Sequence, residues 1–277
     1  MQELGRLREL TFRAAGEGTG RALDTDLYDN YYTQLICWNP ATREIVGGYR
    51  LGAVDKILRN YGLRGLYTFS LFKFGRGFLQ HPAMAGGMAL ELGRSFVRPE
   101  YQRSFAPLLA LWRGIAAYVA HHPQYRVLFG PVSISNDYLP ASRIMLVEYL
   151  RQHCSDAALS RLIRPRTPVR RRHPLAGLSQ DFTHLHSLDT ISTLLEQLEP
   201  DQKGVPVLLR QYLKLGGKLL GFNLDTQFGD AIDGLIMVDL PKTELKTLQK
   251  YMGREETAAY LEEHCRKLTI DNGQLTT

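Results

Sequence analysis

The sequence predicts an α/β sandwich, in which a mixed and mostly antiparallel central sheet is flanked by helices. Two observations in the first 155 residues lead to this prediction. Two runs rich in β-forming residues follow one another closely enough to pair as a hairpin. Further along, an amphipathic helix separates two strand-like runs, as in a β–α–β crossover. Strands and helices that alternate in this way pack as layers around a core.

The hairpin is preceded by a helix and a loop. Residues 3–13 carry apolar side chains at helical spacing and predict a short amphipathic helix. The glycine-rich segment 16–20 predicts a flexible loop that gates a substrate, because it lacks the strand and the Gly-Lys-Ser/Thr ending of a phosphate-binding loop. Residues 32–38 and 44–51 predict two strands, and Pro40 favours a turn between them.

The crossover follows the hairpin. Residues 88–97 alternate between apolar and polar side chains, and residues 125–135 are mostly apolar, so both predict strands. The helix between them is expected to begin with Ser104 as its cap and Pro107 in its first turn. It is expected to end at the His-His-Pro sequence of residues 121–123.

The remaining chain adds helices and one strand. Helices are predicted at 142–154, 192–198 and 207–220, and a final strand at 234–240. A basic, proline-rich link at about 160–180 separates the first of these helices from the second. We therefore expect three parts: a core at 1–155, an extension at 156–245 that packs on the core and completes the sheet, and a polar tail at 246–277.

The composition excludes several classes of protein. The 277 residues are 44% hydrophobic and 22% charged, which excludes a disordered chain. No run of about 18 apolar residues could span a bilayer as a helix. The first residues lack the apolar core of a signal peptide, so we expect a cytoplasmic protein. Cys37, Cys154 and Cys265 lie too far apart for a zinc knuckle or a disulfide scaffold.

The net charge of +6 is unevenly distributed, because six arginines fall between Arg161 and Arg172. One interpretation is a solvated connecting segment. The other is a basic patch for an acidic partner, either an anionic membrane or an acidic carrier protein. The segment has no interleaved aromatic residues on which bases could stack, so we expect no nucleic acid partner.

Metal centres and covalent nucleophiles find little support in the sequence. His121 and His122 are adjacent and point in different directions on a helix, and no HExxH motif occurs. There is no Gly-x-Ser-x-Gly motif, and Ser133 and Ser135 fall within an apolar strand. We therefore expect no catalytic metal and no acyl-enzyme intermediate.

A set of charged residues is more informative. Its members are Asp26, Asp29, Arg50, Glu91 and Arg94. Glu91 and Arg94 would face opposite sides of a strand unless a bulge at Leu92-Gly93 re-aimed one of them. Two interpretations stay open from the residues alone: salt bridges at the edge of the core, or a reaction site.

Several longer segments carry a resemblance to known proteins. They are RLRELTFRAAGEGTG, DLYDNYYTQLICWN, IVGGYRLG, LELGRSFVRPEYQ, GPVSISNDY and PVLLRQYLKLGGKLLGFNLDTQFGDAIDGLIMVDL. Over about residues 5–241 the chain resembles the GNAT superfamily. Within it, the chain is similar to long-chain N-acyl amino acid synthases and ornithine- or glycine-lipid N-acyltransferases, often labelled hemolysin. It is less similar to acyl-homoserine-lactone synthases, which carry a tryptophan about where Gly18 stands here.

This resemblance implies a GNAT-like core at 1–155 and an N-acyltransferase activity. A long-chain fatty acyl group, with or without a 3-hydroxyl, would move to the α-amine of an amino acid. Glycine is favoured over ornithine or lysine as the acceptor. Glu91 would be the general base, and backbone N–H groups of the bulge that ends at Arg94 would polarise the thioester carbonyl. Arg50 or Arg94 would hold the acceptor carboxylate, and Asp26 and Asp29 would order the arginines.

The resemblance also implies where the donor binds. Its phosphopantetheine arm would reach the start of the helix at Arg98, Arg103 and Ser104. The usual glycine-rich pyrophosphate loop is not evident there, so acyl carrier protein is favoured over acyl-CoA as co-substrate, and no bound cofactor is expected. Phe69 and Phe72 would line a slot for the acyl chain, unless they are simply core residues.

Further partners and alternative functions follow from the same resemblance. The basic link and the helix at 207–220 predict a peripheral contact with a membrane surface. Some relatives are fused to a glycerolipid-type O-acyltransferase domain, so such a domain is an expected partner, fused or separate. The alternative functions are an acyl-homoserine-lactone-type synthase and a non-catalytic module that binds acyl chains or membranes.

Overall fold

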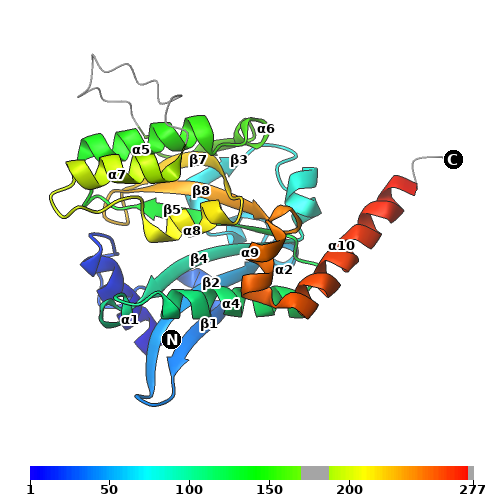
Figure 1. Ribbon diagram of the computed structural model, residues 1–277, viewed down its shortest axis with the longest axis horizontal. Helices are drawn as coiled ribbons and strands as arrows, with labels where there is room; N and C mark the ends of the chain where they lie inside the picture. The colour runs from blue at the N-terminus through cyan, green and yellow to red at the C-terminus, as the bar shows by residue number, and fades with distance from the viewer. Residues whose placement is uncertain (170–186, 274–277) are drawn as a thin grey trace.

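A six-stranded sheet forms the centre of the protein, in the spatial order β1-β2-β4-β5-β8-β7 (Figure 1). This computed structural model describes residues 1–169 and 187–273. The strands are β1 (Thr33–Asn39), β2 (Glu44–Ala53), β4 (Ala89–Val97), β5 (Val127–Ile134), β7 (Lys218–Asp225) and β8 (Ala231–Asp239). β4 and β5 pair in parallel, and the other four neighbouring pairs of this sheet are antiparallel. The prediction of a mixed, mostly antiparallel sheet flanked by helices is confirmed.

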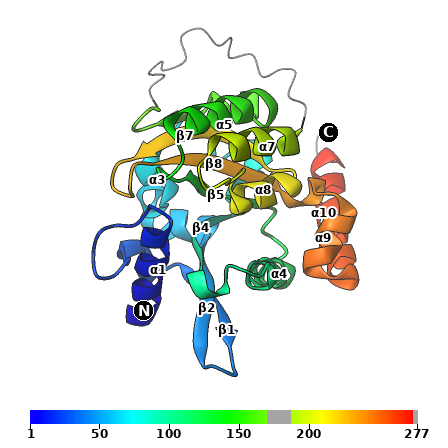
Figure 2. The same ribbon diagram turned by 60° about the vertical axis from the view of Figure 1, so that its left-hand side comes forward.

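The hairpin and the crossover form where the sequence predicts them. β1 and β2 pair as an antiparallel hairpin that projects beyond the helices (Figure 2). α4 (Ala106–His121) connects β4 to β5, and Pro107 lies in its first turn. The Ser104 hydroxyl accepts a hydrogen bond from the Ala106 backbone N–H at 3.1 Å and so satisfies one of the unpaired N–H groups at the helix start.

The larger layer of helices covers one face of the sheet. Its members are α4, α5 (Pro140–His153), α7 (Leu188–Leu198), α8 (Val207–Lys214) and α9 (Leu245–Met252). Trp112 of α4 lies at the centre of this layer and is 2% exposed. Its ring meets those of Tyr49 and Tyr212 edge to face, with centroids 6.1 and 5.0 Å away. These contacts bring β2, α4 and α8 into a single core.

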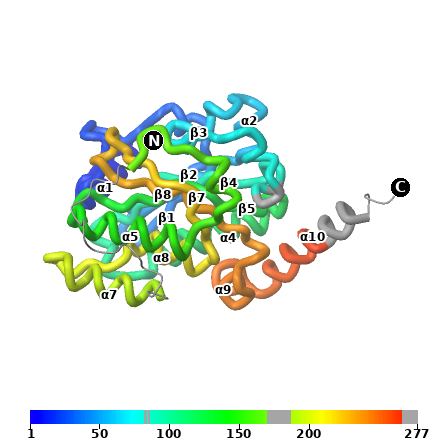
Figure 3. The backbone as a smooth tube through the Cα atoms, turned by 90° about the horizontal axis from the view of Figure 1, so that it is seen from above, coloured from blue at the N-terminus to red at the C-terminus, as the bar shows by residue number. Residues whose placement is uncertain are grey.

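A smaller layer covers the opposite face of the sheet (Figure 3). It consists of α2 (Val54–Tyr61), α3 (Thr68–Leu71), α6 (Ala157–Ser160) and a two-stranded sheet of β3 (Phe72–Phe74) and β6 (Ile163–Pro165). Leu66, Phe78 and Met84 are fully buried beneath it. The sequence analysis assigned none of these elements, because they are short and lack a clear period.

The two ends of the chain flank the sheet. α1 (Gln2–Ala14) packs Leu7 and Phe12 against Phe96 of β4 and Phe228 of the turn between β7 and β8. α10 (Arg254–Gly273) follows α9 and extends away from the sheet (Figure 1). Among the helices of the described residues, none has a stretch long and apolar enough to cross a bilayer.

The predicted helix at 207–220 is wrong in its second half. α8 ends at Lys214, and residues 218–225 form strand β7. Gly216 has a φ of 83° and is followed by a second glycine, so this pair terminates the helix and turns the chain into the strand. β7 then pairs with β8, which extends the sheet beyond β5.

β4 and β5 pair only where they begin. The paired residues are 89–91 of β4 and 127–129 of β5, although both strands continue for several residues. Gly130 lies at the point where pairing stops, and a Cβ built on it would be 2.0 Å from the carbonyl oxygen of Leu92. Glycine therefore allows the two strands to approach there before they separate.

We expect Gly130→Ala to destabilise the protein by about 1–3 kcal/mol, because the added methyl group must displace the backbone of β4. Gly93→Ala is the matched control, since a Cβ on Gly93 would have no atom within 4 Å. Urea denaturation of both variants measures the effect. Equal stability of the two variants would show that the approach of the strands at Gly130 is not tight.

Candidate active site

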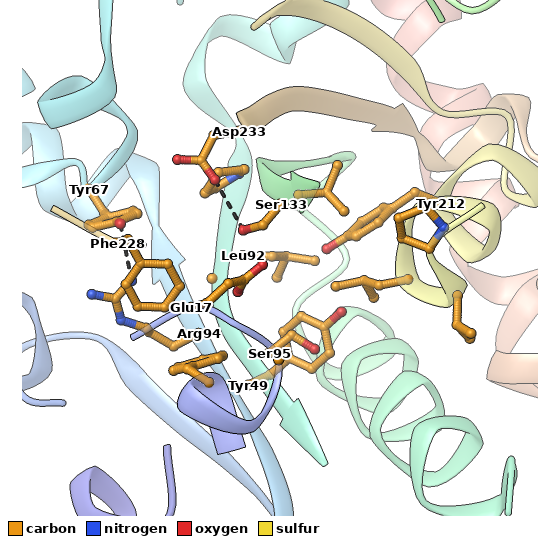
Figure 4. Close-up of a pocket in the computed structure, with 18 of the residues that line it drawn as sticks. Glu17, Tyr49, Tyr67, Leu92, Arg94, Ser95, Ser133, Tyr212, Phe228 and Asp233 are labelled. Carbon is orange, nitrogen blue, oxygen red and sulfur yellow. Dashed lines mark hydrogen bonds between the residues drawn. The ribbon is translucent and has the colours of Figure 1, made fainter. Parts of the chain in front are cut away.

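A cavity of about 350 Å³ occupies the gap between the separated ends of β4 and β5 (Figure 4). We call it the inner cavity. Its labelled lining residues are Glu17, Tyr49, Tyr67, Leu92, Arg94, Ser95, Ser133, Tyr212, Phe228 and Asp233. Val132 belongs to the core under α4, whereas Ser133, next along β5, points to the other face of the sheet. Because both line the cavity, it passes through the sheet from one face to the other.

A second cavity of about 450 Å³ adjoins the first, and we call it the outer cavity. Both are lined by Phe12, Glu17, Ser95 and Leu208, among others. The outer cavity extends to the start of α4, and its walls are mostly apolar. The residues there are Phe96, Val97, Arg103, Ser104, Phe105 and Leu108. Together the two cavities form a bent cleft that leads from the N-terminus of α4 into the gap in the sheet.

A bulge in β4 directs Arg94 toward the inner cavity. Arg50 of β2 pairs with Gly93 and Gly48 pairs with Phe96, so β4 carries one residue more than β2 at this point. Arg94 has a φ of 48°, in the left-handed region. The bulge was expected at Leu92-Gly93, but the extra residue falls at the Arg94 position. This re-aims Arg94 itself rather than its neighbours.

The guanidinium of Arg94 is held from several sides. Its Nε lies 3.0 Å from a carboxylate oxygen of Asp24, and one terminal nitrogen donates to the Tyr67 hydroxyl at 3.0 Å. The rings of Tyr67 and Phe228 each lie 4.9 Å from its central carbon. Arg94 is therefore a positioned cation at the wall of the cavity.

Two further arginines lie behind Arg94 in a buried network of charges. Arg8 and Arg50 are each 1% exposed. Arg8 donates to Asp29 at 2.7 Å, and Arg50 donates to Asp26 at 2.6 Å. Asp26 and Asp29 thus order arginines, as expected. Arg50 lies among the rings of three tyrosines and does not line the cavity, so Arg94 alone of the two reaches it.

Glu91 faces away from the inner cavity and is 1% exposed. Its carboxylate accepts hydrogen bonds from the backbone N–H groups of Tyr67 at 3.0 Å and Thr68 at 2.6 Å, and from the Tyr32 hydroxyl. Burial raises the pKa of Glu91, although the hydrogen bonds oppose the shift. The expectation that Glu91 is the general base does not fit this geometry, because its oxygens satisfy the start of α3 instead.

Two other carboxylates do face the inner cavity. Asp233 of β8 is 3% exposed and accepts a hydrogen bond from Ser133 at 3.1 Å. Glu17 lies on the loop after α1 and lines both cavities (Figure 4). Burial, reinforced by the charge of Asp233, raises the pKa of Glu17 to about 8. Burial and the charge of Asp225 raise the pKa of Asp233 to about 7.

Neither carboxylate was singled out in the sequence, but each left a signal. Glu17 falls within the glycine-rich loop that was expected to gate a substrate. Asp233 stands one residue before the predicted final strand and is the acidic residue of an otherwise apolar run. An ionisable group in a buried strand position needs a partner or a function.

The remaining predicted residues divide between the cleft and the rest of the protein. Arg103 and Ser104 line the outer cavity. Arg98 does not, because its guanidinium pairs with Glu44 at 3.4 Å and Glu100 at 3.2 Å. The six-arginine segment ends outside the described residues, which stop at 169 before resuming at 187.

Phe69 and Phe72 line neither cavity. Phe72 is fully buried among the core residues under α3, and Phe69 packs against that same core. The expectation that they line a slot for the acyl chain is therefore wrong, and the alternative, that they are core residues, fits the structure.

We expect Asp29→Asn to make the protein less stable at neutral pH and less sensitive to acid. Burial opposes ionisation of Asp29, but hydrogen bonds from Arg8 and the Asp26 backbone hold its pKa at about 2, below the reference value of 3.8. The lowered pKa contributes about 2 kcal/mol above that reference value, and this contribution is lost as the pH falls toward about 2.

Urea denaturation of both proteins across the acidic range measures this. The difference between wild type and variant should shrink on acidification. Glu3→Gln, which breaks an exposed pair with Arg6, is the control and should change little. A difference that does not depend on pH would contradict the assignment.

Comparisons with known proteins give results consistent with this site. A family model described as an acetyltransferase (GNAT) domain matches residues 7–113. A protein of Phocaeicola vulgatus named glycine N(alpha)-acyltransferase is 33% identical over 250 residues, covering 86% of this chain and 75% of that protein. A Bacteroides thetaiotaomicron protein of the same name is 33% identical over 254 residues, covering 86% and 73%.

A more divergent relative carries a different name. A protein of Agrobacterium fabrum named L-ornithine N(alpha)-acyltransferase is 29% identical over 256 residues, covering 90% of this chain and 78% of that protein. No solved structure matches the chain. On the strength of the GNAT domain match and the extent of the first two similarities, the chain belongs to the GNAT-domain amino acid N(alpha)-acyltransferase family.

Proposed function

We propose that this protein transfers a long-chain fatty acyl group from acyl carrier protein to the α-amine of an amino acid, with glycine as the preferred acceptor. The observation that carries this proposal is the inner cavity, where one arginine and two carboxylates of raised pKa face the same space. An amino acid carries the complementary groups, a carboxylate and an amine. The preference for glycine is supported by the names of the two relatives that are 33% identical.

Arg94 is the residue suited to the acceptor carboxylate. A guanidinium binds a carboxylate through two parallel hydrogen bonds, and the contacts of Arg94 with Asp24 and Tyr67 hold its plane in place. Asp233, on the opposite strand, is suited to the ammonium group of the incoming amino acid. A bound ammonium would favour the ionised form of this carboxylate.

Glu17 is the residue suited to act as the general base. It lines both cavities, so it lies where a donor in the outer cavity and an acceptor in the inner cavity would meet. Its pKa of about 8 is close to that of an α-amino group in a peptide, which makes proton transfer between the two groups nearly balanced.

The reaction then needs no covalent enzyme intermediate. The ammonium group first loses a proton, and the neutral amine attacks the thioester carbonyl carbon. A C–N bond forms, Glu17 takes the second proton of the amine, and the C–S bond breaks as the thiolate leaves and is protonated. Backbone N–H groups of β4 beyond Glu91, released from pairing with β5, are suited to stabilise the oxyanion.

The outer cavity is suited to the phosphopantetheine arm of the donor. Its apolar walls end at Arg103 and Ser104, beside the positive end of the α4 dipole, where a phosphate is stabilised. The chain lacks a glycine-rich pyrophosphate loop before α4, which favours a carrier protein over coenzyme A.

Product analysis by mass spectrometry tests the proposed reaction. The protein is incubated with palmitoyl acyl carrier protein, or with palmitoyl-CoA, in the presence of the twenty amino acids and ornithine. We expect one dominant product, N-palmitoylglycine, formed faster from the carrier protein. A dominant acyl-ornithine would overturn the glycine assignment, and no product from either donor would favour a non-catalytic binding module.

We expect Arg94→Lys to raise the KM for the amino acid at least about tenfold, because lysine cannot form the bidentate contact. The matched control is Arg98→Lys, which changes an arginine of the same strand end that pairs with Glu44 outside the cleft. Steady-state kinetics with varied amino acid compares the two. A similar KM for both variants would contradict the role of Arg94.

We expect Glu17→Gln to lower kcat/KM by about 10²–10⁴-fold at pH 8, because the general base is lost. The ratio of wild-type to variant kcat/KM removes the ionisation of the substrate from the comparison. This ratio should rise with pH and level off above about 8, since a base must be ionised to accept a proton.

Glu91→Gln separates this assignment from the one based on the sequence. It should mainly lower the melting temperature, because an amide cannot accept all of the hydrogen bonds that the carboxylate receives. If Glu91→Gln abolished turnover in a stable protein while Glu17→Gln did not, the base would be Glu91 after all.

A further inference from the structure

We propose that the smaller layer of the fold, around α2, β3 and β6, is a docking surface for an anionic lipid bilayer. We call it the basic face and define it by six exposed cations: Arg59, Arg64, Lys73, Arg76, Arg161 and Arg164. This surface is separate from the acyl-transfer cleft, and the proposal does not depend on the reaction.

The charge of the basic face is not neutralised by the protein. Residues 54–80 and 157–169 together contain one acidic residue, Asp55, which accepts a hydrogen bond from the Tyr125 hydroxyl at 3.1 Å. Within the described part of the chain, none of the six cations forms an ion pair. Their positive potential is therefore directed into the solvent.

The small sheet places two of these cations side by side. Lys73 of β3 is the direct cross-strand neighbour of Arg164 of β6, and both are exposed. Like charges in this position oppose strand pairing. An anion between them would turn this repulsion into attraction, and the headgroup phosphates of a bilayer supply such anions.

An apolar groove of about 580 Å³ lies among the cations. Leu58, Leu63, Phe74 and Leu79 contribute to its walls, and Arg76 is part of its lining. Leu63 is 39% exposed, and neighbouring Tyr61 is 52% exposed. Apolar side chains surrounded by basic ones are typical of proteins that bind at the interface of anionic membranes, where the chains enter the headgroup region.

The position of the basic face favours a bilayer over an acidic protein. A carrier protein must deliver its arm to the outer cavity at the start of α4, and α4 lies on the other face of the sheet. α2 and β3 cover the face opposite α7 and α8 (Figure 3). A carrier bound to the basic face would thus lie behind the sheet from the mouth of the cleft.

Vesicle co-sedimentation of the full chain tests the proposal. Vesicles contain either equal parts of phosphatidylglycerol and phosphatidylcholine, or phosphatidylcholine alone. We expect binding to the anionic vesicles that weakens with added salt, and little binding to the neutral ones. A triple variant, Arg59→Glu, Arg64→Glu and Arg76→Glu, should bind at least about 100-fold more weakly, at about fivefold for each charge lost.

A control variant carries the same charge change on the other layer. It is Arg113→Glu, Lys214→Glu and Lys246→Glu, on α4, α8 and α9, and it should bind like the wild type. If the control loses binding and the first variant keeps it, the membrane contacts the α8 side, and the proposal is overturned.

Two more outcomes separate folding and an acidic protein partner from lipid binding. The same three arginines changed to glutamine remove the charge more gently, and circular dichroism melting identifies a variant that fails to fold. If the glutamate variant raises the KM for acyl carrier protein but binds vesicles normally, the basic face serves a protein partner, and the proposal is overturned.

Discussion

The buried network of three arginines and three aspartates is the interaction on which the candidate site depends. Arg8 comes from α1, Arg50 from β2 and Arg94 from β4, while the aspartates lie on one short segment between α1 and β1. Charges placed in such an environment are costly unless each is compensated. Only one arrangement of these elements pairs them all, so the network determines how the segment after α1 lies against the end of β4. It thereby places Glu17 and Arg94 on the same cavity.

The balance of charge at the cavity follows from this arrangement. Arg94 gives much of its positive charge to Asp24, so little remains to stabilise a second and third carboxylate nearby. Glu17 and Asp233 consequently have raised pKa values, about 8 and about 7. An empty cavity at neutral pH thus holds carboxyl groups that are partly protonated. An incoming ammonium group would shift them toward the ionised state, in which one of them can accept a proton.

Local patterns in the sequence were enough to predict the centre of the fold. The helix with Ser104 and Pro107 at its start, the hairpin around Pro40 and the strand ending at Val97 all have short-range signals, such as caps, turns and alternation. Strand β7 was missed because the apolar spacing of α8 continues past Lys214, and the double glycine that ends the helix carried too little weight. The resemblance identified the chemistry correctly at the level of the family.

The details of the site could not be predicted, because they depend on contacts between distant segments. Glu91 and Arg94 are close in sequence and were expected to share a task, yet the bulge separates them. Glu91 satisfies the N–H groups that begin α3, and Arg94 turns into the cavity. A link between them persists through Tyr67, whose backbone N–H donates to Glu91 and whose hydroxyl accepts from Arg94. Glu91 therefore acts on the site through the position of Tyr67, which makes it a positioning residue.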